Sequence, residues 1–213
     1  MGQEVTSDYE EFANARLSGK FSEMGSWQLV LPRLEGKKTL DIGCANGLHL
    51  RHLSDDSIGL EQMPKLVADG RSNGLNIVEG DIDCLQSFGS AEFDAVLYSH
   101  VLEHVNSPIV TLRHVHRVLR HKGTLVLGLP TERNVYRDLL RMDYFKGTHI
   151  YAFSIGNAKK LLGETGFDTV EVIYHLPKCR SRIGLMALRL FNALLLPFRS
   201  YFSMGYWIVA EKR

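Results

Sequence analysis

A short glycine-rich segment preceded by a carboxylate is the feature of this sequence that most clearly suggests chemistry. The segment L-D-I-G-C-A-N-G-L spans residues 40–48 and places small residues at Gly43, Ala45 and Gly47. Such residues let the backbone approach a ligand closely, and glycine also tolerates positive φ. Asp41 stands two positions before the first glycine. The segment is therefore predicted to bind a ligand where a strand ends.

The spacing and charge of this loop distinguish two classes of cofactor. Dinucleotide-binding enzymes use G-x-G-x-x-G and seat a pyrophosphate on the N-terminus of the following helix. Here the third small residue comes one position early, and a carboxylate suits a pyrophosphate poorly. S-adenosylmethionine (SAM) carries an ammonium and a sulfonium group and no phosphate, which suits the carboxylate. The loop thus argues against a nicotinamide oxidoreductase, and its predicted cofactor-binding residues are Asp41, Gly43, Cys44, Ala45 and Gly47.

Further polar residues stand where three later strands are expected to end. Glu61 lies about 20 residues beyond the loop, where an acidic side chain can accept both ribose hydroxyls. Asp81 is placed to accept a hydrogen bond from an adenine amine, with Ile82 against the ring. His100 follows the fourth strand. Each residue also has a plainer explanation: Glu61 as a solvated strand end, Asp81 as a turn residue and His100 as a helix cap. Taken together, they indicate one crevice. The added cofactor-binding predictions are Glu61, Gln62, Asp81, Ile82, Ser99 and His100.

Histidines near the expected crevice are candidates for acid–base chemistry. An oxygen acceptor usually needs a base to remove its proton, and histidine is suited to this at neutral pH. His149 is the preferred base because it follows the fifth strand, and a purely structural role is its alternative. His104 is the second catalytic candidate, although a wall or structural role fits it better. Three others are expected to face solvent: His114, His116 and His121.

Alternating apolar and amphipathic stretches would position these side chains. Strands are predicted at 39–42, 57–61, 75–78, 93–99, 123–129, 169–175 and 206–212, and helices at 47–53, 64–72, 108–119 and 154–165. Two further helices are predicted within residues 8–34, separated by Gly19. The alternation predicts an α/β fold with a parallel sheet covered on both faces. The last two strands lack such a crossover and are expected to pair antiparallel.

Composition fits one globular domain and excludes several other classes. The chain has a net charge of +1, so there is no general electrostatic attraction to nucleic acid, and none is expected as a partner. Three cysteines without a C-x-x-C pair, Cys44, Cys84 and Cys179, indicate neither a disulfide framework nor a metal site. The polar N-terminus shows no secretion signal, so a cytoplasmic location is expected.

The chain resembles the class I SAM-dependent methyltransferases, in particular the broad small-molecule group. The matching segments are T-L-D-I-G-C-A-N-G at 39–47, I-G-L-E at 58–61, V-E-G-D-I at 78–82, F-D-A-V-L-Y-S-H-V-L-E-H-V at 93–105 and R-V-L-R-H-K-G-T-L-V-L-G-L-P at 117–130. Residues 145–153 look like ubiquinone-biosynthesis O-methyltransferases, and residues 74–83 are similar to MetW-like proteins. These short matches do not fix a substrate.

The resemblance implies a Rossmann-like, seven-stranded sheet of order 3-2-1-4-5-7-6, with strand 7 antiparallel and helices on both faces. It places Asp41, Gly43 and Gly47 at the methionine part of SAM, Glu61 at the ribose and Asp81 at the adenine. The expected activity is methyl transfer from SAM to a small-molecule acceptor at oxygen, with S-adenosylhomocysteine as product. No N/D-P-P-Y motif follows the fourth strand, which disfavours amine methyltransferases of the adenine and glutamine type.

Ala45 departs from the resemblance, because glycine is usual there. Its methyl group is expected to be tolerated if φ is negative. The departure keeps open the alternative of a SAM-binding regulatory or assembly protein without turnover.

One domain is expected over 1–213, with an N-terminal helical cap at 1–36 and an apolar insert at 177–204. Within the insert, residues 182–204 combine apolar side chains with arginines and are too short and polar for a membrane span. The segment is expected to cap the active site or to form a homodimer contact. The alternative is an interfacial helix at a membrane surface, which would suit a lipid-like acceptor.

Overall fold

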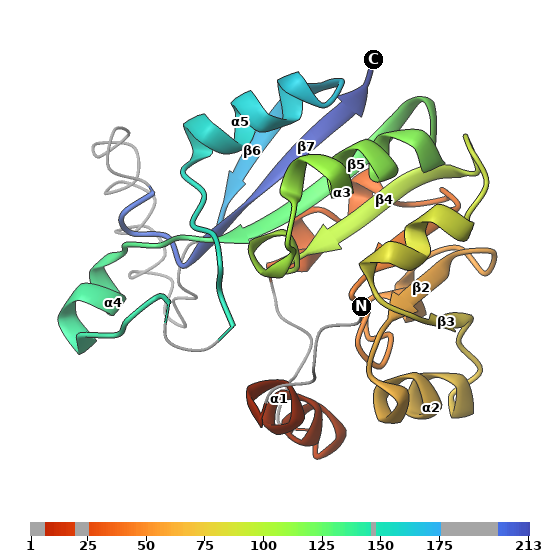
Figure 1. Cartoon of the computed structure of the whole chain (residues 1–213), viewed down its shortest axis with the longest axis horizontal. Coiled ribbons are helices and arrows are strands. Elements are labelled where there is room, and N and C mark those ends of the chain that lie inside the picture. The colour runs from red at the N-terminus through yellow and green to blue at the C-terminus, as the bar shows by residue number, and fades with distance from the viewer. Residues whose placement is uncertain (1–6, 20–25, 146–147, 176–199) are drawn as a thin grey trace, which may run out of the picture.

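The computed structural model describes residues 7–19, 26–145, 148–175 and 200–213. Its centre is a seven-stranded sheet of order β3-β2-β1-β4-β5-β7-β6 (Figure 1). The strands are β1 Thr39–Ile42, β2 Ile58–Glu61, β3 Ile77–Glu79, β4 Phe93–Ser99, β5 Leu119–Pro130, β6 Phe167–Tyr174 and β7 Gly205–Lys212. Neighbours among the first five pair in parallel, whereas β7 runs antiparallel between β5 and β6. The predicted fold class and strand order are confirmed.

Helices and single turns connect the strands. The α-helices are α1 Ser7–Leu17, α2 Pro64–Ser72, α3 Pro108–Val118, α4 Val135–Leu140 and α5 Ile155–Glu164. The 3₁₀ turns are η1 Trp27–Leu29, η2 Leu31–Arg33, η3 Leu50–His52, η4 Ile82–Ser87 and η5 Leu102–His104. The helix predicted at 154–165 is confirmed: the Ser154 hydroxyl accepts a hydrogen bond from the Asn157 amide at 3.2 Å, and Gly166 follows with φ +93°.

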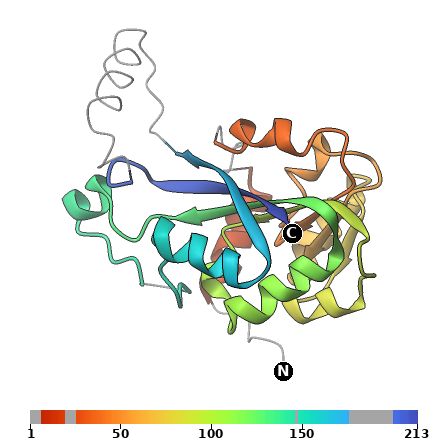
Figure 2. The same ribbon diagram turned by 90° about the horizontal axis from the view of Figure 1, so that it is seen from above.

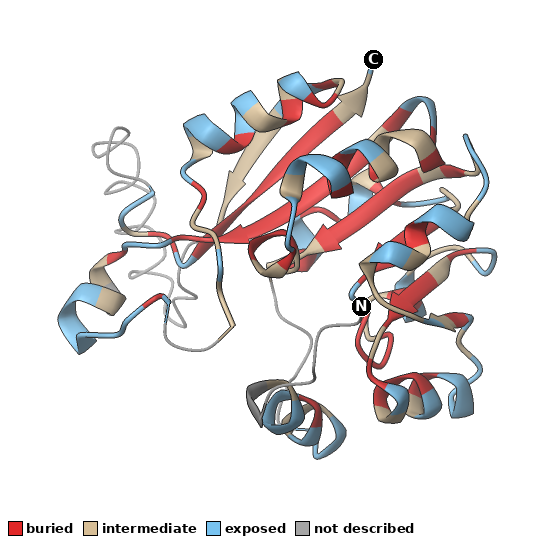
Figure 3. Cartoon of the chain, viewed as in Figure 1, coloured by how far each residue is buried: buried red, intermediate tan, exposed pale blue. Residues whose placement is uncertain are grey.

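Alternation along β4 divides the core into two layers. Val96 and Tyr98 pack with buried residues of α3 and α5, whereas Ala95 and Leu97 pack with Trp27 and its neighbours in η1 and η2. Figure 2 shows α3 and α5 on one side of the sheet, and Figure 3 shows β4, β5 and β7 as largely buried. A sheet covered on both faces exposes its strand ends, so the site is expected at the carboxyl edge.

Two of the predicted helices are wrong. The segment 47–53 forms turns and the short η3, because Gly47 takes φ +78°, which is incompatible with a right-handed helix. Residues 26–34 form two 3₁₀ turns in place of the second N-terminal helix, and Pro32 within η2 lacks the amide hydrogen that a continuous helix needs.

The histidines expected at the surface differ from one another. His121 is exposed, but His114 and His116 are half-buried. The rings of His116 and Phe167 contact each other edge-on, with 5.4 Å between their centroids. Burial lowers the pKa of His116. The prediction that His116 faces solvent is therefore wrong, because α3 turns this position toward the start of β6.

The apolar insert predicted at 177–204 falls almost wholly outside the described residues, of which only 200–204 belong to it. Its proposed roles as a cap, a dimer contact or a membrane-surface helix therefore stay predictions. Among the described residues, none of the helices combines the length and apolar character needed to cross a bilayer.

Candidate functional site

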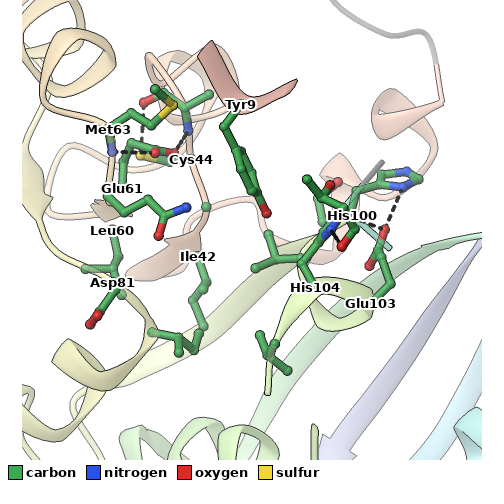
Figure 4. A pocket seen from close by; sticks show the side chains of 18 of the residues that line it. Tyr9, Ile42, Cys44, Leu60, Glu61, Met63, Asp81, His100, Glu103 and His104 are labelled. Atoms are coloured by element: carbon green, nitrogen blue, oxygen red, sulfur yellow. Dashed lines mark hydrogen bonds and ion pairs between the residues drawn. The ribbon is translucent and has the colours of Figure 1, made fainter. Parts of the chain in front are cut away.

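A cavity of about 530 Å³ lies at the carboxyl ends of the parallel strands, a volume typical of small-molecule sites. Figure 4 shows Glu61, Cys44 and Met63 at one end and Glu103, His100 and His104 at the other, with Tyr9 between them. The lining includes every predicted site residue except Asp41 and Gly47: Gly43, Cys44, Ala45, Glu61, Gln62, Asp81, Ile82, Ser99, His100, His104 and His149.

Gly43 begins the turn that forms one wall of this cavity. Its amide donates to the Leu60 carbonyl at 2.8 Å, and its φ is +71°. A Cβ atom added here would overlap the Cγ2 methyl of Val101. Only glycine combines that conformation with such a close approach, so the loop and the end of β4 can border one cavity.

Ala45 also adopts a left-handed conformation, with φ +51°. The condition under which its methyl group was expected to be tolerated, a negative φ, is therefore not met. The methyl is instead accommodated by packing, because Ala45 is buried in a small cluster with Ala13, Met63 and Leu66. The loop thus keeps a glycine-like backbone although it carries a side chain.

Gly47 serves packing and does not border the cavity. Its φ is +78°, and a Cβ atom there would overlap Cδ1 of Leu75. The glycine therefore lets the loop lie directly on the residues that precede β3.

Glu61 at the end of β2 is fixed by the glycine loop and by its own chain. One carboxylate oxygen accepts from the Ala45 amide at 2.9 Å and the other from the Met63 amide at 2.8 Å. The residue is 8% exposed, and burial raises its pKa while these backbone hydrogen bonds oppose the rise. A carboxylate has about four acceptor sites. Glu61 can therefore hold the loop and still accept ligand hydroxyls.

Asp41 lies behind the loop and is 1% exposed. Among the described residues, its Oδ2 atom has no hydrogen-bond partner and stands 3.8 Å from Nδ1 of His49. Burial raises the pKa of Asp41 to about 8, against the opposing effect of the Arg16 guanidinium. An incompletely satisfied buried carboxylate beside a glycine cradle fits a ligand that brings positive charge.

The third and fourth strand ends contribute Asp81 and His100. Asp81 accepts a hydrogen bond from the Asp83 amide at 3.1 Å and so caps η4, a turn role that coexists with its place in the cavity wall. His100 has φ +55°, and its Nδ1 atom lies 3.6 Å from Oε1 of Glu103. Val101 occupies the cap position of η5, so His100 is not that helix cap.

The far end of the cavity gathers two histidines around a buried carboxylate. Glu103 is 0% exposed, and neither of its carboxylate oxygens has a hydrogen-bond partner among the described residues. His104 Nδ1 lies 3.0 Å from the Thr148 carbonyl, and His149 Nδ1 lies 2.8 Å from the Tyr144 carbonyl. Burial lowers the pKa of His149. The ring centroids of His104 and His149 lie 4.9 Å apart, so the structure brings both catalytic candidates together.

Several lining residues were missed by the sequence analysis. Glu103 stands in the L-E-H-V segment and was overlooked although two neighbouring histidines flank it. Tyr9, Phe12 and Arg16 come from α1, which borders the cavity although no motif marks it. Lys65 of α2 holds this helix through an ion pair with Glu10 and a 3.1 Å hydrogen bond to Asn14.

Comparison with known proteins places this geometry in a family. A family model described as "Methyltransferase domain" matches residues 9–172. The chain is 32% identical over 104 residues to a ubiquinone biosynthesis O-methyltransferase from Xanthomonas oryzae, covering 45% of this chain and 44% of that one. It is 28% identical over 167 residues to a tRNA U34 carboxymethyltransferase from Haemophilus influenzae, covering 69% and 51%. The chain thus spans about half the length of these curated relatives.

A solved structure shows the same fold. A SAM-dependent methyltransferase from Archaeoglobus fulgidus superposes with a TM-score of 0.68 at 23% identity, covering 88% of this chain and 91% of that one. SAM is therefore the cofactor that these comparisons indicate. The close approach that Gly43 allows and the buried carboxylate of Asp41 both fit a ligand that carries positive charge. The chain belongs to the methyltransferase domain family and has the fold of SAM-dependent methyltransferases.

Proposed function

We propose that the protein transfers a methyl group from SAM to an oxygen atom of a small-molecule acceptor. The observation that carries this proposal is a single cavity with a cofactor-like end at Gly43 and Glu61 and a histidine-rich end at His104 and His149. The two ends share one continuous lining, so a donor at one end and an acceptor at the other would meet inside a partly enclosed volume.

The residues at the cofactor end divide their tasks by chemistry. The Gly43 turn would accept the amino-acid part of SAM, and the buried Asp41 carboxylate behind it would balance its positive charge. Glu61 would accept the ribose hydroxyls through the lone pairs that its two backbone amides leave available. Asp81 and Ile82 border the cavity beyond β3, where the adenine would contact a polar and an apolar side chain.

SAM supplies an activated methyl group, so the protein needs mainly to position the acceptor, exclude water and manage one proton. His149 would promote loss of the acceptor proton. Its Nδ1 atom faces the Tyr144 carbonyl, which only accepts hydrogen bonds, so Nδ1 carries hydrogen and Nε2 is the atom available for chemistry. His104 has the same arrangement toward the Thr148 carbonyl and would form the adjoining wall.

A SAM-binding regulatory protein without turnover is the second candidate. The observation in its favour is Ala45, whose left-handed backbone and buried methyl group depart from the usual glycine. A relative named for action on tRNA U34 also widens the set of acceptors to test. The net charge of +1 favours a small molecule over a nucleic acid.

Calorimetry and an acceptor screen test the proposal in sequence. We expect S-adenosylhomocysteine to bind, NAD not to bind, and Glu61→Ala to weaken binding by roughly 1–3 kcal/mol per lost hydrogen bond. Labelled methyl transfer is then measured with phenols, catechols, amines and tRNA. Binding without transfer to any acceptor would favour the regulatory alternative, and failure to bind S-adenosylhomocysteine would refute both.

A further inference from the structure

We propose that Glu103, His104 and His149 form a binding site for a divalent transition-metal ion. One potential ligand atom from each of the three side chains lies within 4.8 Å of the other two. The inference rests on the proposed function only for what the ion would do there, because the binding site itself follows from the geometry.

The buried carboxylate is the first argument for an ion. Glu103 is 0% exposed, and neither oxygen has a hydrogen-bond partner in the described part of the chain. Its Oε1 atom lies 3.6 Å from Nδ1 of His100 and 3.9 Å from Nε2 of His104. These separations are too long for hydrogen bonds. A carboxylate buried in this way is costly unless a cation compensates it.

The orientation of the histidines is the second argument. A backbone carbonyl can only accept, so the Nδ1 atoms of His104 and His149 must donate to Thr148 and Tyr144. This tautomer directs hydrogen to Nδ1 and the lone pair to Nε2. Metal-binding histidines commonly show the same support, with the second ring nitrogen held by a backbone carbonyl or a carboxylate.

The size of the site is the third argument. Ligand atoms at metal bond lengths of about 2.0–2.2 Å lie roughly 3 Å apart around one ion. The present separations of up to 4.8 Å would therefore close by side-chain rotation when an ion binds. Two imidazoles and one carboxylate suit zinc, iron, cobalt or nickel better than magnesium, which prefers oxygen ligands.

The three side chains lie in the part of the cavity where the proposed function places the acceptor. Glu103, His104 and His149 all line the cavity at the end away from Glu61. An ion held there would lower the pKa of an acceptor hydroxyl, and the released proton would pass to solvent water. His149 would then promote proton loss through the ion, since its Nε2 lone pair cannot bind a metal and a proton at once.

Metal binding is tested on the full chain without SAM or acceptor. After chelator treatment and dialysis, Zn²⁺ is titrated by calorimetry and Co²⁺ by visible absorption. We expect one equivalent to bind with micromolar affinity or better and to raise the melting temperature. Because loss of outer-shell partners alone costs about 10–100-fold in affinity, His149→Ala, His104→Ala and Glu103→Gln should each cost at least tenfold.

The exposed His121 provides the matched control. His121→Ala should bind Zn²⁺ like the wild type, and Mg²⁺ should bind far more weakly than Zn²⁺. Circular dichroism identifies any variant that fails to fold, and the three substitutions lie on two separate segments, so one failure leaves the others informative. Absence of stoichiometric Zn²⁺ and Co²⁺ binding, or equal affinity in all variants, would overturn the site. The proposed methyltransferase activity is measured separately, and that result would not contradict it.

Discussion

Glu61 and Glu103 line the cavity at opposite ends, and their carboxylates have contrasting environments. Glu61 is held by two backbone amides, at 2.9 and 2.8 Å, from residues of the adjoining loops. Glu103 is even more buried, yet neither of its carboxylate oxygens has a hydrogen-bond partner among the described residues. Its neighbour His149 comes from a loop 46 positions further along the chain, between α4 and α5.

Under the proposed function, this difference would assign different tasks to the two ends of the cavity. At the glycine-loop end the fold itself satisfies the Glu61 carboxylate, although the Asp41 carboxylate behind the loop is incompletely satisfied. The other end keeps an unsatisfied buried carboxylate beside two oriented rings, which is costly unless a ligand completes it. Substitutions at the two ends should therefore separate cofactor binding from turnover.

The sharpest separation is expected from His149→Ala. With an acceptor that the wild type methylates, the rate of methyl transfer should fall by about 10²–10⁴-fold, because a group that promotes loss of the acceptor proton typically contributes that much. Affinity for S-adenosylhomocysteine should stay close to that of the wild type, since Glu61 and the glycine loop are untouched. Steady-state kinetics and calorimetry on the same preparation measure both quantities.

His121→Ala is the control for this comparison, because that histidine is exposed on β5. An unchanged rate in His149→Ala would remove this residue from the chemistry. Equal losses of rate and cofactor affinity would show that the two ends are not separable.

At the cofactor end, Gly43→Ala should have the next largest effect. The alanine would have to adopt φ +71°, and its methyl group would overlap the Val101 side chain. The left-handed conformation costs about 1–2 kcal/mol and the overlap adds about 1–3 kcal/mol, so cofactor affinity or stability should fall by roughly 2–5 kcal/mol.

Gly36→Ala is the matched control, because Gly36 has φ +69° with open space around its Cβ position. It should show the conformational cost alone. If both variants lose the same stability and neither loses cofactor affinity, the close approach of loop and β4 has no role in binding.

The buried Asp41 predicts a pH dependence of stability. Its pKa is raised to about 8 in the folded chain, mainly by burial, against an ordinary value of about 3.9. Between these values the folded state keeps a proton that the unfolded state has lost, so the free energy of unfolding should fall as pH rises. The slope from this one group is at most about 1.4 kcal/mol per pH unit.

Urea denaturation of the wild type and of Asp41→Asn at several pH values between these limits measures this contribution. The variant should show a shallower decline than the wild type. Saturating SAM should also flatten the wild-type decline, because its positive charge favours the ionised carboxylate. Identical slopes in wild type and variant would show that Asp41 does not titrate in this range.

Ala45→Gly should produce the smallest change. Glycine would relieve about 1–2 kcal/mol of left-handed strain and remove one buried methyl group worth about 0.8 kcal/mol. The net change in the free energy of unfolding should therefore be at most about 1 kcal/mol and stabilising. A clear loss of stability would mean that packing against Ala13, Met63 and Leu66 outweighs the strain.

The cavity wall at Gly43 and Glu61 could be predicted from sequence because its parts are local. The turn at Gly43, the strand before it and the carboxylate at the end of β2 lie within about 20 residues, and their spacing indicates a strand–turn arrangement. The strand order also followed, since alternating elements and the family resemblance restrict the topology. The helix predicted at 47–53 was wrong because Gly47 has a positive φ and lies where an added Cβ atom would overlap Leu75, and spacing in the sequence shows neither.

The histidine-rich end of the cavity could be predicted only in part. His104 and His149 were selected singly, but their contact and the unsatisfied state of Glu103 depend on how the loop after α4 folds back on η5. The part played by α1 was also hidden, because Tyr9, Phe12 and Arg16 form no recognisable motif. Such long-range placements leave no spacing in the sequence to read.

The position of α1 links ligand residence time to the local stability of one helix. Ala13 is the only fully buried residue in the described part of α1, and Lys65 connects this helix to the neighbouring α2 (Figure 1). A ligand that touches Tyr9 or Phe12 would therefore add to the docking energy of the helix. By linkage, undocking of α1 and product dissociation become coupled events, and weakening the Lys65–Glu10 pair should shorten the lifetime of the product complex.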